Sequence, residues 1–330
     1  MSKVTVLTAV YNAERFLPQC LDSVLGQSVS DLQLVCIDDA STDGSLSILK
    51  DYAARDSRVR LITHDVNTGQ AVARNDGLEV ADGEYVIMVD ADDWLSEDAL
   101  EAAVTVLDND SRMGCVLLNL TYQYEDGRTE SYPMRSGKTV WTGYEAFELS
   151  LDWSVHGLYM ARAELYRKWP FDATVRLFSD DNTTRIHYLN SELVGSCKGV
   201  YYYRQHGGSM TNSANVLRYD LLEANSSMAR QLRGLDLPAE VLSKFERERW
   251  INLTGVCIWW LEHEARTAES VFNEGVLRRL EAVYEDVDKS LLPTALKLKP
   301  GYRPCGGFNG WLRQVKFYNM LRKTVRFANK

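Results

Sequence analysis

The run Asp90-Ala91-Asp92-Asp93 ends the apolar stretch Tyr85 to Val89 and is followed by Trp94. Carboxylates packed this densely at the end of a strand repel one another, so they are tolerated mainly where a divalent cation neutralises them. Hard cations take oxygen ligands. The run therefore predicts a site for a metal and a diphosphate.

The acidic run belongs to a regular alternation of strand-length and helical patterns. We expect strands at Val4 to Val10, Leu32 to Ile37, Val59 to Thr63 and Tyr85 to Val89. We expect helices at Glu14 to Leu25 after an Asn12 cap, at Ser45 to Arg55, at about Gln70 to Val80, and from Ser96. Such alternation indicates an α/β fold with a mostly parallel sheet flanked by helices.

Polar residues stand at three of the predicted strand ends. Tyr11-Asn12, Asp38-Asp39 and Asp90 to Asp93 each follow a strand, and in open parallel sheets ligands bind beyond the carboxyl ends of the strands. The first strand continues as Tyr11-Asn12-Ala13-Glu14 instead of a glycine-rich turn, so a backbone cradle for a dinucleotide is missing. This excludes NAD-dependent oxidoreduction, and a metal and side chains must hold the diphosphate.

Beyond Cys115 the pattern changes. The segments Cys115 to Tyr124 and Arg128 to Met134 flank Glu125-Asp126-Gly127 and predict a hairpin or a long excursion from the sheet. Mixed structure follows, and from about Val216 to Leu291 the period is helical. We expect one α/β domain over residues 1–212 and a helical C-terminal region over residues 213–330.

Charge and cysteine usage limit the functional classes. The chain has 330 residues and a net charge of -9, which argues against a nucleic-acid surface. The six cysteines are scattered without a Cys-x-x-Cys pair, which favours core thiols in a reducing compartment. Neither a signal peptide nor an apolar segment of bilayer length is evident. We therefore expect a cytoplasmic protein.

Four ordered segments give the chain a family resemblance. They are VTVLTAVYNAERFLPQCLDSVLGQS (Val4 to Ser28), IDDASTDGS (Ile37 to Ser45), NTGQAVARNDGL (Asn67 to Leu78) and DGEYVIMVDADDW (Asp82 to Trp94). Together they resemble a GT-A glycosyltransferase of family 2, strongly to about Leu107 and more weakly to about Asn212. The resemblance implies a Rossmann-like sheet that binds a nucleotide sugar.

The resemblance also implies a nucleotide site. Its residues would be Ala9, Tyr11, Asp38, Asp39, Arg74, Asp90 and Ala91. Tyr11 would flank the base and Asp39 would take the pyrimidine edge, since a carboxylate can accept the uracil N–H. The alternative is a turn in which Asp38, Ser41 and Asp43 cap the next helix. Arg74 would reach the nucleotide or brace neighbouring carboxylates, with a surface arginine as the alternative.

For the metal, the resemblance implies that Asp90 and Asp92 bind the cation that bridges the diphosphate, with Asp92 as the more direct ligand. Asp93 would support the geometry or cap the next helix. His206, in a Tyr-rich and Gly-rich run, would contact the metal or the diphosphate, or be a structural histidine. Mg²⁺ or Mn²⁺ is the expected cation, because both accept octahedral oxygen ligation.

A second acidic pair matches the family's catalytic base. The resemblance aligns Asp181 with the base and puts Asp180 in place of a glutamate, although a register error of one residue or simple helix capping remain alternatives. Trp153 and His156 are candidates for the acceptor side. Family members commonly carry a basic residue where Gly157 stands, so acceptor contacts are expected to differ here.

The last segment, Trp311 to Lys330, contains six basic residues and no acid. On a helix, one stripe forms opposite most of the charge, namely Trp311, Val315, Tyr318, Leu321, Val325 and Ala328. A basic amphipathic helix can lie on an anionic bilayer. The alternative is that the stripe docks onto the protein's own core.

The hypothesis that accounts for all these features is that the protein is a metal-dependent, inverting glycosyltransferase. It would move a sugar from a nucleotide donor, most simply a UDP-sugar, to a glycan or polyprenyl-linked glycan in surface polysaccharide synthesis. A sugar-nucleotide nucleotidyltransferase would be expected to open with a glycine-rich basic loop. An inactive nucleotide-sugar binding module would lack the base, which Asp180-Asp181 argues against. The helical region from Val216 suits a homodimer surface as well as an acceptor lid.

Overall fold

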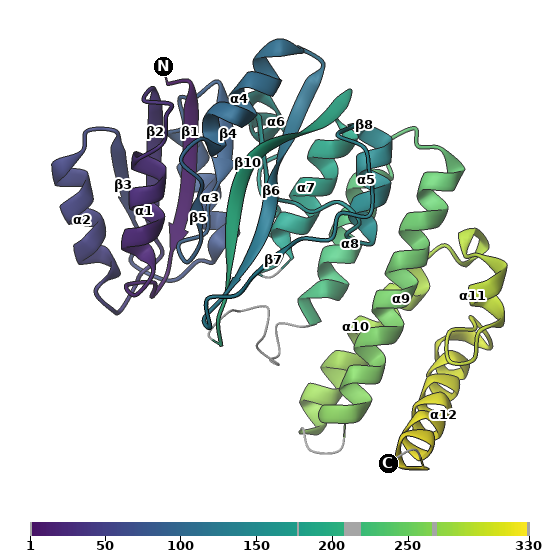
Figure 1. Cartoon of the computed structure of the whole chain (residues 1–330). Coiled ribbons are helices and arrows are strands. Elements are labelled where there is room, and N and C mark those ends of the chain that lie inside the picture. The colour runs from purple at the N-terminus through teal and green to yellow at the C-terminus, as the bar shows by residue number, and fades with distance from the viewer. Residues whose placement is uncertain (1, 177, 208–218, 266–268, 329–330) are drawn as a thin grey trace. The chain divides into compact units, whose positions relative to one another are not determined.

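The computed structural model describes residues 2–176, 178–207, 219–265 and 269–328, and it divides into two compact units (Figure 1). Unit 1 is Met1–Ser213 and unit 2 is Ala214–Lys330. Side chains are described in these ranges except at 270–271 and 323–328. Among the described residues, the strands lie in unit 1, and unit 2 consists of helices and turns.

Unit 1 is built on a mixed sheet with the strand order β3-β2-β1-β4-β9-β6-β10-β5. The pairs that join β3, β2, β1 and β4 are parallel, as the alternation predicts. Beyond β4 the sheet is mixed, because β9 runs antiparallel to both β4 and β6. The long strands β6 and β10 are parallel, and β7 and β8 pair with their ends. The strands are β1 (Val4–Val10), β2 (Leu32–Asp38), β3 (Val59–Thr63), β4 (Tyr85–Met88), β5 (Trp94–Leu95), β6 (Met113–Tyr124), β7 (Thr129–Ser131), β8 (Val140–Thr142), β9 (Tyr159–Arg162) and β10 (Leu193–Gln205).

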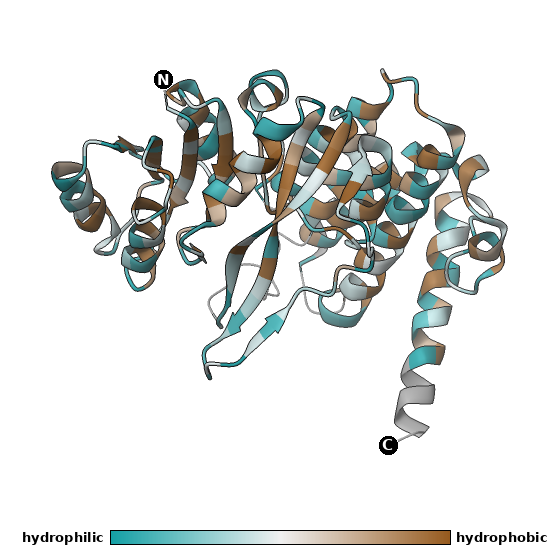
Figure 2. Ribbon diagram, turned by 45° about the horizontal axis from the view of Figure 1, so that its top comes forward, coloured by the Kyte–Doolittle hydropathy of each residue, from teal (hydrophilic) through white to brown (hydrophobic). Residues whose placement is uncertain are grey.

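Helices cover both faces of this sheet, which confirms the predicted α/β class. Alternation along β1 sends Val4 and Val6 to one core and Leu7 to the other. The first core takes α1 (Leu17–Leu25), α2 (Ser45–Arg55) and α4 (Ala99–Asn109), and the second takes α3 (Gln70–Glu79), α5 (Gly143–Leu151), α6 (Ala163–Lys168) and α7 (Ser179–Leu189). Figure 2 shows the hydrophobic residues concentrated along the strands.

Two predicted helix starts are wrong. Helix α1 begins at Leu17 instead of Glu14, because Asn12 adopts a φ of 52° and its side chain accepts a hydrogen bond from the Thr42 N–H at 2.7 Å. Asn12 therefore ties two loops together and caps no helix. Helix α4 begins at Ala99 instead of Ser96, because the preceding residues pair with β10 as strand β5.

Unit 2 contains a helical core rich in aromatic rings. The rings of Trp250, Tyr284 and Trp311 lie 5.5 to 5.7 Å apart. A buried Arg249 contacts Glu246 at 2.9 Å, so this charge is paired within the core. The elements are α8 (Asp220–Leu232), α9 (Ala239–His263), α10 (Ser270–Asp286), η3 (Lys289–Leu291), α11 (Thr294–Leu298) and α12 (Gly307–Ala328).

Helix α12 only partly follows the predicted apolar stripe. Trp311 and Val315 are fully buried in the core of unit 2, and Tyr318 packs beside them. Leu321, by contrast, is 46% exposed. The side chains of Val325 and Ala328 lie outside the described residues. The first part of the stripe therefore docks onto the protein's own core. No helix in the described ranges has the length and hydropathy to cross a bilayer.

Candidate active site

The acidic turn after β4 is held in place by β10. The Tyr201 hydroxyl donates to Asp93 Oδ2 at 2.9 Å and accepts from the Asp90 N–H at 3.1 Å. The Arg204 N–H donates to the other oxygen of Asp93 at 2.7 Å. Asp93 is only 2% exposed. This carboxylate therefore fixes the shape of the turn, and the carboxylates of Asp90 and Asp92 are the ones left to face a ligand.

Asp92 receives two further contacts from the end of β10. Arg204 Nε donates to the backbone oxygen of Asp92 at 2.8 Å, and its guanidinium lies over the rings of Phe16 and Trp94. His206 Nε2 lies 2.9 Å from Asp92 Oδ2. The Asp92 side chain is still 35% exposed. The structure thus brings His206 to the acidic turn.

Arg74 is buried against the same turn. Its Nη2 lies 2.5 Å from Asp90 Oδ1, and the side chain is 2% exposed. Burial lowers the pKa of Arg74, and the charges of Asp90 and Asp180 raise it. Together these charges outweigh burial, so the pKa lies above its ordinary value. Among the described residues, Nε and Nη1 find no hydrogen-bond partner. The alternative of a surface arginine is therefore wrong, and Arg74 braces Asp90 while the N–H groups of its Nε and Nη1 remain unused among the described residues.

The turn concentrates negative charge in a poorly solvated place. Burial raises the pKa of Asp90, Arg74 opposes this, and Asp92 and Asp180 add to it. Burial also raises the pKa of Asp93 well above its ordinary value, and the charges of Asp90 and Asp92 raise it further. A nearby cation would relieve this repulsion.

The residues at the turn fit a cation that shares its ligands with a diphosphate. Within the described parts of the chain, no three His, Cys, Asp or Glu side chains form a complete metal site. Mg²⁺ is usually held by one or two carboxylates and takes its other ligands from phosphates and water. Asp90 and Asp92, each with a side chain 35% exposed, supply such a pair of carboxylates.

At the end of β2, Asp39 is enclosed by hydrogen-bond donors. Its Oδ1 accepts from the Thr68 N–H and hydroxyl at 2.8 and 2.9 Å and lies 2.9 Å from His64 Nδ1. Its Oδ2 accepts from the Gly69 N–H at 2.8 Å. Burial alone would raise the pKa of Asp39, but the contacts from Thr68, His64 and Gly69 lower it. Asp39 is thus a fixed carboxylate whose Oδ2 keeps one lone pair for a further donor.

The neighbouring acids have different partners. Asp43 Oδ1 accepts from the Ser45 N–H at 3.0 Å, so this residue supports the start of α2. Asp38 Oδ2 accepts from the Ser41 N–H at 3.3 Å, while its buried Oδ1 has no partner among the described residues. Asp43 thus contacts the first residue of α2, whereas Asp39 takes no part in the start of that helix and is 3% exposed. Nearby, Tyr11 is 52% exposed, Ala9 is half-buried and Ala91 is 7% exposed.

Helix α7 carries the second acidic pair. Burial raises the pKa of Asp181 to about 7, Arg185 lowers it and Asp180 raises it further. Arg185 lies one turn along the helix, with its guanidinium 5.1 Å from the ring of Trp153. The charge of Asp180 also raises the pKa of Asp90 in the acidic turn. A pKa of about 7 at Asp181 is suited to a general base near neutral pH.

Two non-glycine residues, one directly before α7 and one in contact with Arg185 of that helix, have left-handed backbones. Phe178, which immediately precedes α7, has a φ of 66°, and Trp153 has a φ of 57°. Such conformations cost of order 1–3 kcal/mol each and gather at functional sites. Trp153 is half-buried and in contact with Arg185, which keeps it as a candidate for the acceptor side.

His156, the other candidate for the acceptor side, is buried. It is 4% exposed, burial lowers its pKa to about 4, and its Nδ1 accepts from the Leu158 N–H at 3.3 Å. The ring is thus part of the core and offers no face to an acceptor. The neighbouring Gly157 packs tightly on α7, because a Cβ there would lie 2.8 Å from Thr184 Oγ1. A basic side chain at that position would require the side chain of Thr184 on α7 to shift.

Sequence reasoning missed His64 and Arg204. His64 directly follows β3, so the strand-end rule that selected Asp38 and Asp90 would have included it. Arg204 lies on β10, and His206 follows the last residue of that strand; both contact Asp92.

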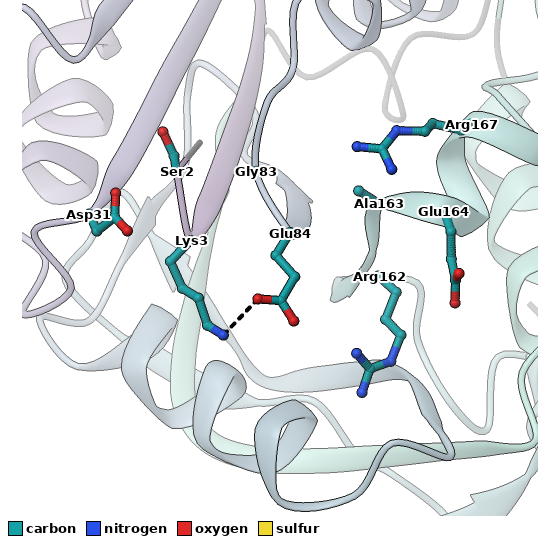
Figure 3. A pocket seen from close by; sticks show the side chains of 9 residues that line it. All are labelled: Ser2, Lys3, Asp31, Gly83, Glu84, Arg162, Ala163, Glu164 and Arg167. Carbon is teal, nitrogen blue, oxygen red and sulfur yellow. Dashed lines mark hydrogen bonds and ion pairs between the residues drawn. The ribbon is translucent and has the colours of Figure 1, made fainter.

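A separate pocket of about 540 Å³ lies at the opposite ends of the strands (Figure 3). Its lining includes Lys3 and Glu84, near the starts of β1 and β4, and Arg162 at the end of the antiparallel β9. Lys3 pairs with Glu84 at 2.8 Å, and Arg162 Nε donates to the Met113 carbonyl at 2.8 Å. This pocket is distinct from the acidic turn, which lies beyond the carboxyl end of β4.

The parallel half-sheet with an acidic turn at its carboxyl edge defines a GT-A glycosyltransferase. A family model described as glycosyl transferase family 2 matches residues 5–172. The chain belongs to this family. The matched segment includes the acidic turn and Asp39 and ends before Asp181 and β10.

Known proteins resemble the chain beyond that segment. GlyA, a glycosyltransferase of Streptococcus pneumoniae, is 41% identical over 89% of this chain and 44% of its own length. EpsJ, an uncharacterized glycosyltransferase of Bacillus subtilis, is 32% identical over 63% of this chain and 62% of its own length. The chain thus spans less than two thirds of either relative.

A crystal structure of S. aureus TarS 1-349 in complex with UDP-GlcNAc superposes with a TM-score of 0.76. The match covers 99% of this chain and 92% of the TarS chain at 20% identity. At this identity the likeness establishes a common fold.

Proposed function

We propose that this chain is a metal-dependent, inverting glycosyltransferase that moves a sugar from a UDP-linked donor to a hydroxyl group of a glycan or lipid-linked glycan in surface polysaccharide synthesis. The observation that carries the proposal is that two acidic groups have different environments. One is the turn braced by Arg74, and the other is Asp181, whose pKa burial raises to about 7. A leaving group and an acceptor need such different environments at once.

The reaction would be a single displacement at C1 of the donor sugar. Asp181 accepts the proton of the acceptor hydroxyl as its oxygen bonds to C1 from the face opposite the diphosphate. The bond from C1 to the diphosphate oxygen breaks, and its electron pair leaves with the nucleoside diphosphate, so the configuration at C1 inverts. Mg²⁺ or Mn²⁺ held by Asp90 and Asp92 would supply positive charge to the leaving diphosphate. Arg74 keeps Asp90 in place and offers its spare N–H groups to the same diphosphate.

Several observations support the donor and acceptor classes. The TarS structure contains UDP-GlcNAc, and Asp39 has the acceptor character that a uracil N–H requires. A relative 41% identical over 30% of this chain is a poly(ribitol-phosphate) beta-glucosyltransferase, which fits an acceptor among surface polymers. The six cysteines are free thiols, which suits a cytoplasmic site of reaction.

The direct test is slow donor hydrolysis. The purified protein is incubated with UDP-, GDP- and dTDP-sugars, with and without Mn²⁺, and free nucleotide is measured. We expect release of UDP from one UDP-sugar only when Mn²⁺ is present. Nucleotide binding without release under any condition would favour a binding module, and release of pyrophosphate from UTP and a sugar phosphate would favour a nucleotidyltransferase.

Asp39→Asn is expected to weaken UDP binding by about 10- to 100-fold, the range for a lost hydrogen bond to a charged group. The ionised carboxylate accepts the uracil N–H, whereas an amide must also place its own N–H groups among the donors of Thr68 and Gly69. Calorimetric titration with UDP and CDP would measure the change. Asp51→Asn, on the exposed surface of α2, is the matched control. Equal affinities of wild type for UDP and CDP would contradict the assignment.

Transfer should also depend on pH through Asp181. The base works only when ionised, so kcat/KM is expected to fall as the pH drops below about 7. Because Arg185 lowers this pKa, Arg185→Met should move the midpoint to higher pH, while Arg185→Lys retains a charge and should move it less. An unchanged midpoint in Arg185→Met would show that another group controls the profile.

A further inference from the structure

The C-terminal part of the chain contains basic residues and no acidic ones. Residues 289–330 contain ten Lys or Arg and no Asp or Glu, so the rest of the chain holds all 46 of its acids. A chain with a net charge of -9 therefore ends in a strongly basic segment, which in unit 2 forms η3, α11 and α12. A concentration of one sign of charge creates a local potential that attracts an anionic surface.

The described part of α12 has a second apolar face besides the one that docks onto the core. Phe317, Met320 and Leu321 are 58%, 57% and 46% exposed. Their spacing of three and four residues puts them on one side of the helix. Trp311 and Val315, on another side, are fully buried. Packing in the core of unit 2 thus accounts for the buried stripe but not for the exposed apolar side chains. Large apolar side chains that are grouped at a surface mark an interaction site.

Basic side chains stand beside this exposed face. Arg313 and Lys316 are both exposed, and each lies one helical turn before an exposed apolar residue, Phe317 and Met320. This arrangement puts positive charge at the edge of an apolar patch.

The segment that begins at the C-terminal end of α11 repeats the combination. Leu298 is 71% exposed and stands between Lys297 and Lys299. The segment is fastened to α12, because the N–H groups of Gly301 and Arg303 donate to Gln314 Oε1 at 3.0 and 3.3 Å. Two separate elements therefore present exposed apolar side chains with basic neighbours.

We propose that α12 binds an anionic lipid bilayer through Phe317, Met320 and Leu321, with Arg313 and Lys316 contacting lipid headgroups. An anionic polymer would be held by charge alone and would leave the three apolar side chains in water. A bilayer accepts both, because the apolar face enters the headgroup boundary while the basic side chains stay at the anionic surface. This inference concerns the surface of unit 2 and is independent of the proposed sugar transfer.

The test is sedimentation of the full chain with sucrose-loaded vesicles. One set is phosphatidylcholine alone, and the other is an equal mixture of phosphatidylcholine and phosphatidylglycerol. We expect binding to the mixed vesicles, reduced by added salt because the headgroup attraction is screened. No sedimentation with the mixed vesicles, or equal sedimentation with both sets, would overturn the proposal.

Surface variants separate the two contributions. Phe317→Ser should weaken binding about tenfold through lost apolar burial. Lys316→Gln should weaken it about fivefold, as expected for one cationic side chain at an anionic surface. The matched controls are Val66→Ser and Lys50→Gln, at exposed positions in unit 1, which should bind as wild type does.

A polymer control distinguishes lipid from any polyanion. Soluble polyphosphate is titrated against the wild type and Phe317→Ser. Wild-type levels of vesicle binding by Phe317→Ser, together with tight polyphosphate binding by both proteins, would overturn the lipid assignment in favour of a charged polymer. Because none of these measurements uses a nucleotide sugar, their outcome is distinguishable from a failure of the proposed enzyme activity.

Discussion

Asp181→Asn is expected to lower the rate of sugar transfer by about 100- to 10,000-fold, the range for loss of a general base. The amide nearly matches the shape of the carboxylate but cannot accept the hydroxyl proton. The acidic turn and Asp39 are untouched, so affinity for UDP in the presence of Mn²⁺ should stay at the wild-type value. Transfer is measured by nucleotide release and binding by calorimetry. Wild-type turnover in this variant together with loss in Asp180→Asn would move the base by one residue.

Stability distinguishes this catalytic loss from unfolding. The folded pKa of Asp181 is about 7 against an ordinary value of 3.8. The folded state therefore binds this proton more tightly than the unfolded state does. As the pH rises from about 3.8 to about 7, the free energy of unfolding consequently falls. Above pH 7 the wild type carries a buried charge that asparagine lacks. At such pH values the melting temperature of Asp181→Asn should consequently be higher than that of the wild type. A variant whose fold is damaged would have a lower melting temperature.

Asp92→Asn, or chelation of the wild type, is expected to reduce transfer by about a thousandfold, since a metal ion supplies several kcal/mol of charge stabilisation to a leaving group. The amide that replaces the carboxylate can still pair with His206, so the fold of the turn should persist. Titration with Mn²⁺ followed by its electron paramagnetic resonance signal would measure metal affinity directly, and it should weaken in the variant.

Asp98→Asn is the matched control for this experiment, because Asp98 is exposed and contacts Ser96 outside the turn. It should retain wild-type transfer and metal affinity. Full activity of Asp92→Asn, or full activity of the wild type after chelation, would remove the metal from the proposed function.

The elements of the first half of unit 1 were accessible from sequence because their signals are local. Strand β3 and helix α2 have the bounds that hydrophobic period predicts, Val59–Thr63 and Ser45–Arg55. The antiparallel insertion of β9 and the short β5 have no comparable signal, since their pairing depends on segments far away in the chain. Helix starts were harder to predict from sequence. Asn12 illustrates this, because a side chain that can cap a helix can equally accept a hydrogen bond from another loop.

For the candidate site, residue types and strand ends predicted the location of the acidic turn and of Asp39, and the family resemblance predicted the pair on α7. The contacts that give each acid its own environment were beyond sequence. Nothing local indicates that Tyr201 takes up the carboxylate of Asp93 or that His156 is enclosed in the core. Such assignments depend on which atoms meet across the fold, and two acids one residue apart look alike in sequence.

The contact between Tyr201 and Asp93 joins residues 108 positions apart. During synthesis the parallel strands β1 to β4 are complete long before β10 leaves the ribosome, so the acidic turn must wait for its support. Until β10 joins β6, the carboxylates of the turn lack the hydroxyl and N–H donors that orient them. Metal and nucleotide would then be captured only by a finished sheet, and their binding would in turn favour the state in which β10 is docked.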